Sequence, residues 1–249
     1  MIIISGDILD INEFSEYSRP SIEWKILNEL HSSGEKYRYD NHEQLRFEVK
    51  LRKEIVNASV ELAKSGFSFA VFHKSRCNPK YWIRTSNGGF RLREDVRPSD
   101  AIRDIFINGR LYATECATAM PIVYLKALLS AVPEAIYNNK FDKIYLMNWH
   151  NLPPLIREVG IPRRSDDVII GDRGYFNNPD VDPKTPELQG ENVIVLPDSL
   201  YYGHGIGVTT ADRIIRMLNS NRRRNATRSA YFMDSVARPN FKRIYSAVI

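Results

Sequence analysis

Cysteine is scarce in this chain. Of its 249 residues only Cys77 and Cys116 are cysteines, too few for a disulfide framework or for a zinc site of the usual ligand spacing. The 5 histidines stand singly, and the acidic residues form no calcium-binding loop, so no metal ion is expected. The glycines within 203–207 fit neither the phosphate-binding loop nor the dinucleotide fingerprint, so no cofactor is expected either.

Long apolar runs and flexible linkers are also missing. No stretch reaches the length of a transmembrane helix without a charge, and Met1–Ser5 has neither a basic region nor a long apolar segment. We therefore expect no membrane insertion and no signal peptide. No Gly/Ser/Pro-rich segment divides the sequence. With 43% hydrophobic and 26% charged residues, the composition is that of a globular protein, and we predict one domain over residues 1–249.

Acidic residues are nearly absent from the C-terminal part. Residues 213–249 hold eight arginines and Lys242 against Asp234 alone, a net charge of +8, whereas the rest of the chain sums to −3. Such a basic segment suits a nucleic acid, an acidic protein surface or an anionic wall polymer. Arg222–Arg224 also has a simpler interpretation, which we prefer: a solvated helix end whose positive charge suits the helix dipole.

What the sequence does contain is an apolar segment in its middle. Between Ala117 and Val132 the only charged residue is Lys126, which predicts a helix with neighbours on every side. Thr114 is expected to be its N-cap, and Cys116 lies in its first turn, where free N–H groups and the helix dipole favour a thiolate. We interpret Cys116 as a nucleophile; the alternative is a small buried hydrophobic residue. Pro121 is expected to bend the helix.

Periodicity and turn residues place other elements around this helix. Further helices are predicted over residues 22–30, 43–64, 97–107 and 210–220. Strands are predicted over residues 67–73, 81–85, 90–93, 143–149, 168–172, 191–196 and 201–208, of which 81–85 and 90–93 form a hairpin. The chain after residue 220 is predicted to be extended. This order indicates an α+β fold in which an antiparallel sheet packs against helices.

A thiol nucleophile needs groups that accept or share its proton. His204 is predicted to lie on a strand between two glycines, and Glu191 begins the preceding strand. Antiparallel pairing of these strands would bring both to one end of the sheet. Glu115 opposes thiolate formation at Cys116 by its charge, yet it can also accept a proton. The alternatives are a structural histidine and a surface carboxylate; Cys77 is taken as incidental.

Several motifs, in this order along the chain, are similar to those of one known family. They are Phe47-Glu-Val-Lys-Leu-Arg52, Lys64-Ser-Gly-Phe-Ser-Phe-Ala70, Ala101-Ile-Arg-Asp104, Glu115-Cys-Ala-Thr-Ala119, Trp149-His150 and Gly190-Glu-Asn-Val-Ile194. The chain resembles the small bacillary spore-coat transglutaminases, which are protein-glutamine gamma-glutamyltransferases of similar length. The resemblance runs from Met1 to the basic C-terminus, and an ordered set of motifs is more specific than any single one.

The resemblance implies a single-domain, papain-like cysteine-enzyme fold with the nucleophile at the start of a buried central helix. By matching motifs, the catalytic residues would be Cys116 as nucleophile, Glu191 as main carboxylate, Glu115 as a partly redundant second carboxylate, and His204. The family's cysteine lies in a hydrophobic tunnel, and Phe69 and Trp149 would form its substrate-binding walls. Where the family has a second tunnel tryptophan, this chain has Leu188, which puts substrate preference in question.

The resemblance also implies an activity and a location. The enzyme would cross-link glutamine- and lysine-bearing spore coat proteins without calcium, through a Cys116 thioester and with release of ammonia. It would be made in the cytoplasm of the mother cell and deposited in the spore coat. Two other classes stay open: a cysteine peptidase or amidase of the same fold acting on cell-wall peptides, and a basic coat or nucleic-acid-binding protein. A nucleic-acid partner would give steep salt dependence.

Overall fold

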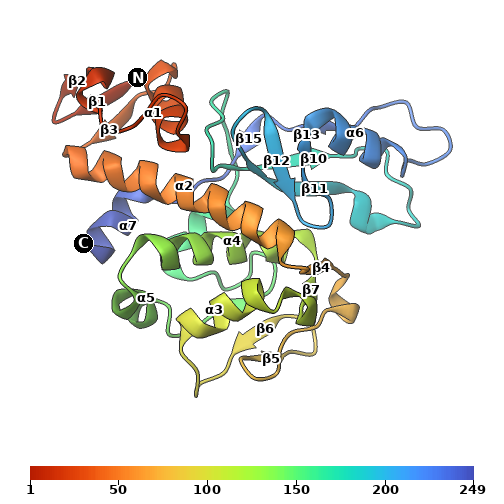
Figure 1. The fold of residues 1–249 in the computed structure, drawn as a ribbon. Coiled ribbons are helices and arrows are strands. Elements are labelled where there is room, and N and C mark those ends of the chain that lie inside the picture. The colour runs from red at the N-terminus through yellow and green to blue at the C-terminus, as the bar shows by residue number, and fades with distance from the viewer.

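Two helices form the centre of the molecule. In the computed structural model, which describes residues 1–249, α2 (His42–Lys64) and α4 (Cys116–Ala131) run side by side through the middle (Figure 1). The side chains of α4 are buried almost all round, because the helix is apolar on every face. In contrast, α2 buries one apolar face, which includes Leu51, Ile55 and Leu62. Both predicted helices are confirmed.

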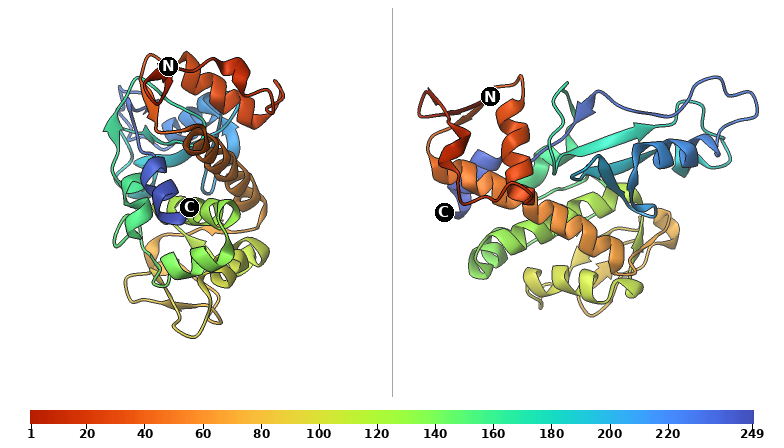
Figure 2. Two further views of the ribbon diagram at one scale, coloured as in Figure 1. Left: turned by 90° about the vertical axis from the view of Figure 1, so that its left-hand side faces the viewer. Right: turned by 45° about the horizontal axis from the view of Figure 1, so that its top comes forward.

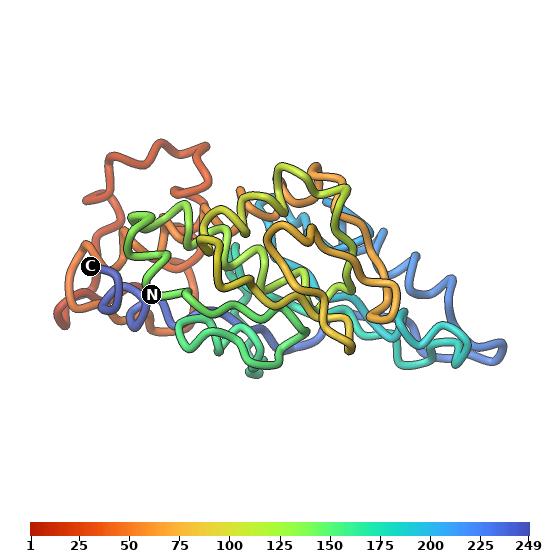
Figure 3. Tube along the Cα trace, turned by 90° about the horizontal axis from the view of Figure 1, so that it is seen from below, coloured from red at the N-terminus to blue at the C-terminus, as the bar shows by residue number.

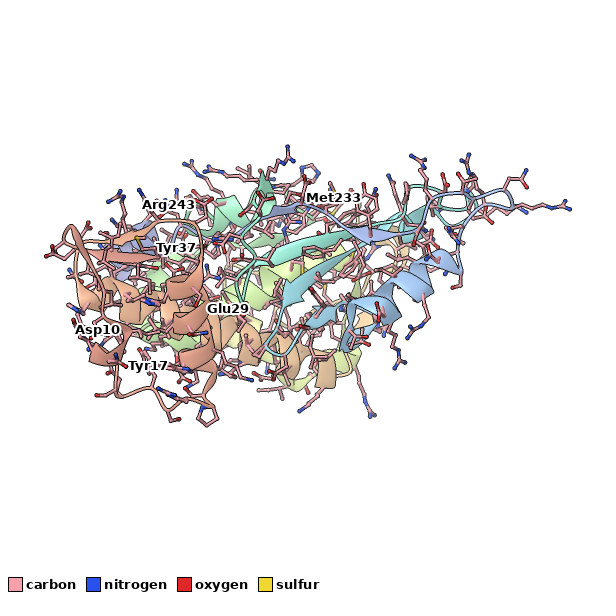
Figure 4. The ribbon with its side chains drawn as sticks, turned by 90° about the horizontal axis from the view of Figure 1, so that it is seen from above. Asp10, Tyr17, Glu29, Tyr37, Met233 and Arg243 are labelled. Carbon is pink, nitrogen blue, oxygen red and sulfur yellow. The ribbon has the colours of Figure 1, made fainter.

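The N-terminal and C-terminal elements cover one end of α2. They are α1 (Ile22–Ser32), the sheet β2–β1–β3 (Asp7–Ile8, Ile2–Ile4 and Tyr37–Tyr39), a 3-10 helix at Ile11–Glu13, and α7 (Phe241–Val248). Figure 1 shows both chain ends on this side of the molecule. Figure 4 shows Glu29 of α1 between these elements and the large sheet, where its carboxylate accepts a hydrogen bond of 2.8 Å from the backbone N–H of Ile170.

A smaller layer lies on the other side of α4. It contains α3 (Pro98–Ile107), α5 (Glu134–Lys140) and the antiparallel sheet β5–β6–β8 (Trp82–Arg84, Phe90–Leu92 and Tyr145–Leu146). The predicted hairpin is therefore confirmed. Next to it, β4 (Ser68–Phe69) pairs in parallel with β7 (Ala113–Thr114). This pairing ties the chain just after α2 to the chain just before α4.

The large sheet has five strands in the order β13–β12–β11–β10–β14, and all neighbours are antiparallel. The strands are Gly207–Thr210, Leu200–Gly203, Gly190–Val195, Arg173–Asn177 and Tyr231–Phe232. Strand β11 contacts α4, and α6 (Ala211–Asn219) packs on the sheet through Ile214 and Leu218. The two views in Figure 2 show the sheet lying beside the central helix pair. An antiparallel sheet packed against helices is thus confirmed.

The remaining elements are short. They are β9 (Arg163–Arg164) paired with β15 (Ser235–Val236), and 3-10 helices at Phe72–Lys74, Gly109–Leu111, Pro154–Gly160 and Pro186–Leu188. One hydrophobic core of 50 buried residues runs from Ile2 to Val248. No helix in the fold is both long and apolar enough to cross a membrane.

An arm extends beyond the far end of the sheet. Its two loops, residues 178–189 and 220–230, run together away from the body of the molecule (Figure 3). The buried carboxylate of Asp180 accepts hydrogen bonds from the side chains of Arg223 and Arg228. These guanidinium groups hold the pKa of that carboxyl well below its usual range. Part of the basic C-terminal segment therefore has a structural role in joining the two loops.

Some predicted strands are wrong. Residues 168–172 form a turn, and the strand begins only at Arg173. The Asp172 carboxylate accepts from the backbone N–H of Ile169 and pairs with Arg52 of α2 at 2.9 Å. The hydrogen bond to Ile169 closes a turn and the ion pair with Arg52 fixes it against α2, so this apolar segment does not join the sheet. The predicted strands 67–73 and 143–149 are also much shorter than expected, as β4 and β8.

Two further predictions are corrected near the C-terminus. The strand predicted over 201–208 is interrupted: His204–Ile206 form the turn between β12 and β13, so His204 does not lie on a strand. The chain after residue 220 is not simply extended, since it contains α7, which packs against α2. Neither α7 nor α5 is predicted, because both are short, at 8 and 7 residues, and short helices give few repeats of the helical period.

Candidate active site

Cys116 is the first residue of α4 and is partly exposed. The residue that caps this helix is Glu115, whose carboxylate accepts from the backbone N–H groups of Ala117 at 2.6 Å and Thr118 at 2.7 Å. The expectation that Thr114 is the N-cap is wrong, because Thr114 belongs to β7 and is fully buried. The N–H groups expected to favour a thiolate are therefore already occupied by a carboxylate.

The surroundings of the Cys116 thiol favour its neutral form. Burial first, and then the charges of Glu191 and Glu115, raise its pKa well above the usual range, while hydrogen bonds from Asn192 oppose the shift. The expectation of a thiolate stabilised by the helix start is thus not met in the free protein. An attack by this sulfur requires that its proton be removed during the reaction.

Glu191 lies on β11 and is only 5% exposed. Its Oε1 atom is buried without any hydrogen-bond partner. Burial and the charge of Glu115 raise the pKa of this carboxyl well above its usual range, and the backbone N–H of His204 opposes them. A Cβ atom at Gly203 would lie only 3.0 Å from Glu191 Cγ. The sequence predicts that Glu191 and His204 meet at one end of the sheet, and the structure places Glu191 beside the backbone of Gly203 and His204 there.

The imidazole of His204 points elsewhere. Its Nε2 lies 3.1 Å from the carbonyl oxygen of Ser68, its Nδ1 lies 3.4 Å from the Tyr202 hydroxyl, and no hydrogen bond joins it to Cys116. Burial lowers the pKa of His204 to about 4, so the ring is neutral at neutral pH. The structure therefore brings Cys116 together with Glu115 and Glu191. The His204 ring lies beside β4 and contacts none of these three side chains through a hydrogen bond.

Phe69 and Trp149 come from two separate elements near the start of α4. Phe69 ends β4 opposite Thr114, two residues before Cys116, and is 37% exposed. Trp149 follows β8 and is partly exposed, with its ring 4.3 Å from the guanidinium carbon of Arg173. Both aromatic side chains are positioned by elements that contact α4 or the strand before it.

Two neighbours of Cys116 are not predicted from the sequence. Asn192 donates a hydrogen bond of 3.5 Å from Nδ2 to Cys116 Sγ. Arg173 is 5% exposed and donates from Nη1 to Asn192 Oδ1 at 2.8 Å. The motif Gly190-Glu-Asn-Val-Ile194 contains Asn192, and its position next to Glu191 is the sequence feature from which a role at the site could have been predicted. Nothing local distinguishes Arg173, because its contacts depend on strand pairing.

Comparisons with known proteins agree with this geometry. A family model described as "Protein-glutamine gamma-glutamyltransferase" matches residues 1–248. The chain belongs to this family. A relative of the same name from Halalkalibacterium halodurans is 39% identical over 238 residues, which cover 96% of this chain and 82% of the relative. One from Bacillus mycoides is 43% identical over 239 residues, which cover 96% and 86%.

A solved structure supports the same assignment. The transglutaminase from Geobacillus stearothermophilus (without C-terminal extension) matches with a TM-score of 0.78 and 48% sequence identity, over 84% of this chain and 99% of that chain. As a member of the protein-glutamine gamma-glutamyltransferase family, the chain is an acyltransferase. The expected family resemblance and the α+β fold with Cys116 at the start of the central helix are confirmed.

Proposed function

We propose that this gamma-glutamyltransferase forms ε-(γ-glutamyl)lysine cross-links between proteins, with Cys116 as its nucleophile. The observation that carries the proposal is the position of the buried Glu191 carboxyl, whose unpartnered Oε1 lies in the same small region as the thiol. A protonated carboxyl next to a neutral thiol is a suitable starting state for a reaction that must both accept and donate protons.

In the first half-reaction, Sγ of Cys116 attacks the carboxamide carbon of a protein-bound glutamine. The thiol proton passes to the active-site carboxyl pair as the S–C bond forms, and a proton from Glu191 goes to the departing nitrogen as the C–N bond breaks. The products are a γ-glutamyl thioester and ammonia. The Nδ2 amide of Asn192, 3.5 Å from the sulfur, is placed to donate toward charge that develops beside it.

In the second half-reaction, a lysine ε-amine attacks the thioester. Lysine is charged at neutral pH, so it must lose a proton before its nitrogen can attack. Glu191 is the proposed acceptor, with Glu115 as the second carboxylate. The C–S bond then breaks, the sulfur regains a proton, and an isopeptide bond remains. His204 acts in this scheme by positioning: its backbone N–H faces Glu191, and its ring contacts the carbonyl oxygen of Ser68, the first residue of β4.

Transfer to an amine requires that water be kept away from the thioester. Phe69 and Trp149, which both lie near the start of α4, are the proposed walls of the substrate path. The proposed steps use protein groups alone, and we propose, from the family resemblance, that the activity is independent of calcium. Leu188, in the arm next to Gly190, replaces a tryptophan of the resembled family and is proposed to widen the substrate path there.

The test is incorporation of a fluorescent primary amine into a glutamine-bearing protein. We expect the wild-type chain to incorporate the amine, and Cys116→Ala to lose incorporation completely while keeping its far-UV circular dichroism and unfolding temperature. Iodoacetamide treatment should abolish the wild-type activity in the same way. Substantial incorporation by Cys116→Ala would remove the sulfur from the mechanism. Hydrolysis of glutamine without incorporation of amine would favour the alternative, a cysteine peptidase or amidase acting on cell-wall peptides.

We further propose that the substrates are glutamine- and lysine-bearing spore coat proteins. The enzyme would be made in the mother-cell cytoplasm and then deposited in the coat. This proposal rests on the family resemblance of the motifs around Cys116 and Glu191. It is tested by comparing coat extracts from sporulating cells with and without the active enzyme: high-molecular-weight, isopeptide-containing coat material should disappear with Cys116→Ala. Unchanged material would exclude coat proteins as substrates.

A further inference from the structure

Arg173 is a buried cation without a carboxylate partner. The side chain is 5% exposed, and it takes part in none of the ion pairs of the structure. Its guanidinium donates from Nε to the carbonyl oxygen of Val159 at 2.7 Å and from Nη1 to Asn192 Oδ1 at 2.8 Å. The Trp149 ring covers it at 4.3 Å. The other buried arginine, Arg52, is paired with two carboxylates.

A buried charge without a counter-charge is costly, so its retention needs a reason. The titratable groups that act on the Arg173 charge are the hydroxyls of Tyr124 and Tyr175 and the Cys116 thiol. The neighbouring buried carboxylate of Asp172 is paired with Arg52 and Arg238 instead. Burial raises the pKa of both tyrosines, that of Tyr175 to about 12, so the two hydroxyls stay neutral. Only the Cys116 sulfur becomes anionic in a thiol-dependent reaction.

The strand register brings the arginine and the sulfur into one hydrogen-bonded chain. Arg173 lies opposite Ile194, and Asn192 lies opposite Tyr175, so the arginine and the asparagine are diagonal neighbours on one face of β10 and β11. Asn192 then reaches Cys116 Sγ through Nδ2 at 3.5 Å. The chain of contacts runs from the guanidinium through one side-chain amide to the sulfur.

Arg173 determines the orientation of the Asn192 side-chain amide in this series of contacts. A guanidinium has only donors, so it must face the carbonyl oxygen of the Asn192 amide. The NH₂ end of the amide is then turned toward Sγ, where it can donate to a thiolate. With the opposite orientation, two donors would meet at the guanidinium and an acceptor oxygen would face the sulfur.

We infer that Arg173 is a positioning residue for the nucleophile: it holds the Asn192 amide so that Nδ2 donates to Cys116 Sγ, and its buried charge stabilises the thiolate. The inference rests on the proposed role of Cys116 as nucleophile. Other charged groups near Cys116 also affect the ionisation of its thiol. Glu115 at the helix start and Glu191 on β11 oppose ionisation, and the backbone of His204 faces Glu191. Arg173 is the cation that counters them.

The experiment measures ionisation of the sulfur directly instead of transferase activity. The full-length chain is alkylated with iodoacetamide at several pH values, and modification of the two cysteine-containing peptides is followed by mass spectrometry. Below the pKa of a thiol, its alkylation rate is proportional to the thiolate fraction, so one pKa unit changes the rate about 10-fold. Cys77 is an internal reference in every sample, since it lies in a separate loop beside β5.

We expect Arg173→Gln to slow alkylation of Cys116 about 10-fold or more at each pH and to leave the Cys77 rate unchanged. Arg173→Lys should recover part of the rate, because it restores the charge but not the fork that orients Asn192. The exposed Arg163 supplies the matched control: Arg163→Gln removes one positive charge that contacts neither Asn192 nor Cys116 and should leave both rates unchanged. N-ethylmaleimide, a bulkier reagent, should show the same ratio, whereas altered access would affect the two reagents differently.

An unchanged Cys116 rate in a folded Arg173→Gln variant overturns the inference. If that variant does not fold, Asn192→Ala is measured instead, because it removes the hydrogen-bond donor to the sulfur while leaving the guanidinium in place. Asn192→Ala should slow Cys116 alkylation. An unchanged rate in this variant overturns the inference. Failure of this inference can be distinguished from failure of the proposed function. Normal amine incorporation with unaffected alkylation removes the role of Arg173 alone, whereas absent incorporation by the wild-type chain removes the proposed function.

Discussion

Oε1 of Glu115 accepts two hydrogen bonds from Thr118, one from its backbone N–H at 2.7 Å and one from its hydroxyl at 2.5 Å. The Thr118 hydroxyl in turn accepts from the backbone N–H of Asn148, next to Trp149, at 2.8 Å. The Glu115 carboxylate is therefore committed to the start of α4. Oε1 of Glu191, in contrast, has no partner. This difference leads to the first prediction.

Glu191→Gln should reduce amine incorporation about 100-fold or more, the usual loss for a general acid–base group, and Glu115→Gln should reduce it less. The physical reason is that only Glu191 has a free oxygen near the sulfur. Both rates are measured on the same glutamine-bearing protein.

The control for the first prediction is thermal unfolding. Glu115→Ala removes a helix cap and should cost about 1 kcal/mol of stability, whereas Glu115→Asp keeps a carboxylate that can cap. Comparing activity at a temperature where all variants are folded separates the loss of the cap from the loss of a base. Equal, small effects of Glu191→Gln and Glu115→Gln on incorporation would remove both carboxylates from the proton transfers.

The second prediction concerns stability at rising pH. Glu191 has a folded-state pKa above its unfolded value near 4.5, so the folded chain binds the extra proton between these two values. Stability supplied by the protonated form is fully present below about pH 4.5 and is lost as pH rises toward the folded pKa. The free energy of unfolding of the wild type should therefore fall relative to that of Glu191→Gln as pH rises. Urea titrations from pH 4 to 8 measure this difference, and a constant difference contradicts it.

The third prediction concerns stability at falling pH, where His204 should have an effect opposite in direction to that of Glu191. Burial lowers the pKa of His204 from 6.5 to about 4, so the unfolded chain binds the extra proton between these values. Stability should be fully present above about pH 6.5 and should fall by about 3 kcal/mol toward pH 4, relative to His204→Gln. Urea titrations at these pH values test the fall.

The same variant also tests the role of His204 in the reaction. Because no hydrogen bond joins its ring to Cys116, His204→Gln should keep more amine incorporation than Glu191→Gln. Complete loss of incorporation in a folded His204→Gln variant would instead show that the imidazole takes part in proton transfer.

The fourth prediction uses two glycines of the turn between β12 and β13. Gly205 has φ +93°, and a Cβ there would lie 3.0 Å from Phe69 Cβ; Gly207 has φ +81° with nothing within 4 Å. Both alanine variants should lose about 1 kcal/mol or more of stability from backbone strain. Only Gly205→Ala should also displace Phe69 and reduce amine incorporation, measured below both unfolding temperatures. Equal activities of the two variants would mean that Phe69 is not part of the substrate path.

Several features could be predicted from the sequence because they depend on neighbouring residues. The helix over 43–64 has a clear apolar period, and the hairpin around Asn87–Gly89 has a turn signal between two strand-forming segments. The central helix is recognisable because its sequence is apolar throughout. The position of Cys116 at the start of that helix could be predicted in the same way, and its role as nucleophile stays a prediction.

Other features could not be predicted in this way. Residues 168–172 are rich in β-branched side chains, yet they form a turn because Asp172 bonds to Ile169 and to Arg52, which lies far away in the sequence. The residue type favours Thr114 as the helix cap, while the pairing of β7 with β4 shifts the helix start by one residue to Glu115. In both cases a long-range contact outweighs a local preference.

By itself the sequence determined the central apolar helix, the cysteine at its start and the carboxylate of Glu115 beside it, since these follow from composition and order along the chain. Only the tertiary structure decided which groups face the sulfur. Antiparallel pairing of β10 with β11 places Arg173 and Asn192 on one face, 19 residues apart in the chain, and the turn after β12 points the His204 ring away. Charge and burial at the site depend on that register, which no local pattern specifies.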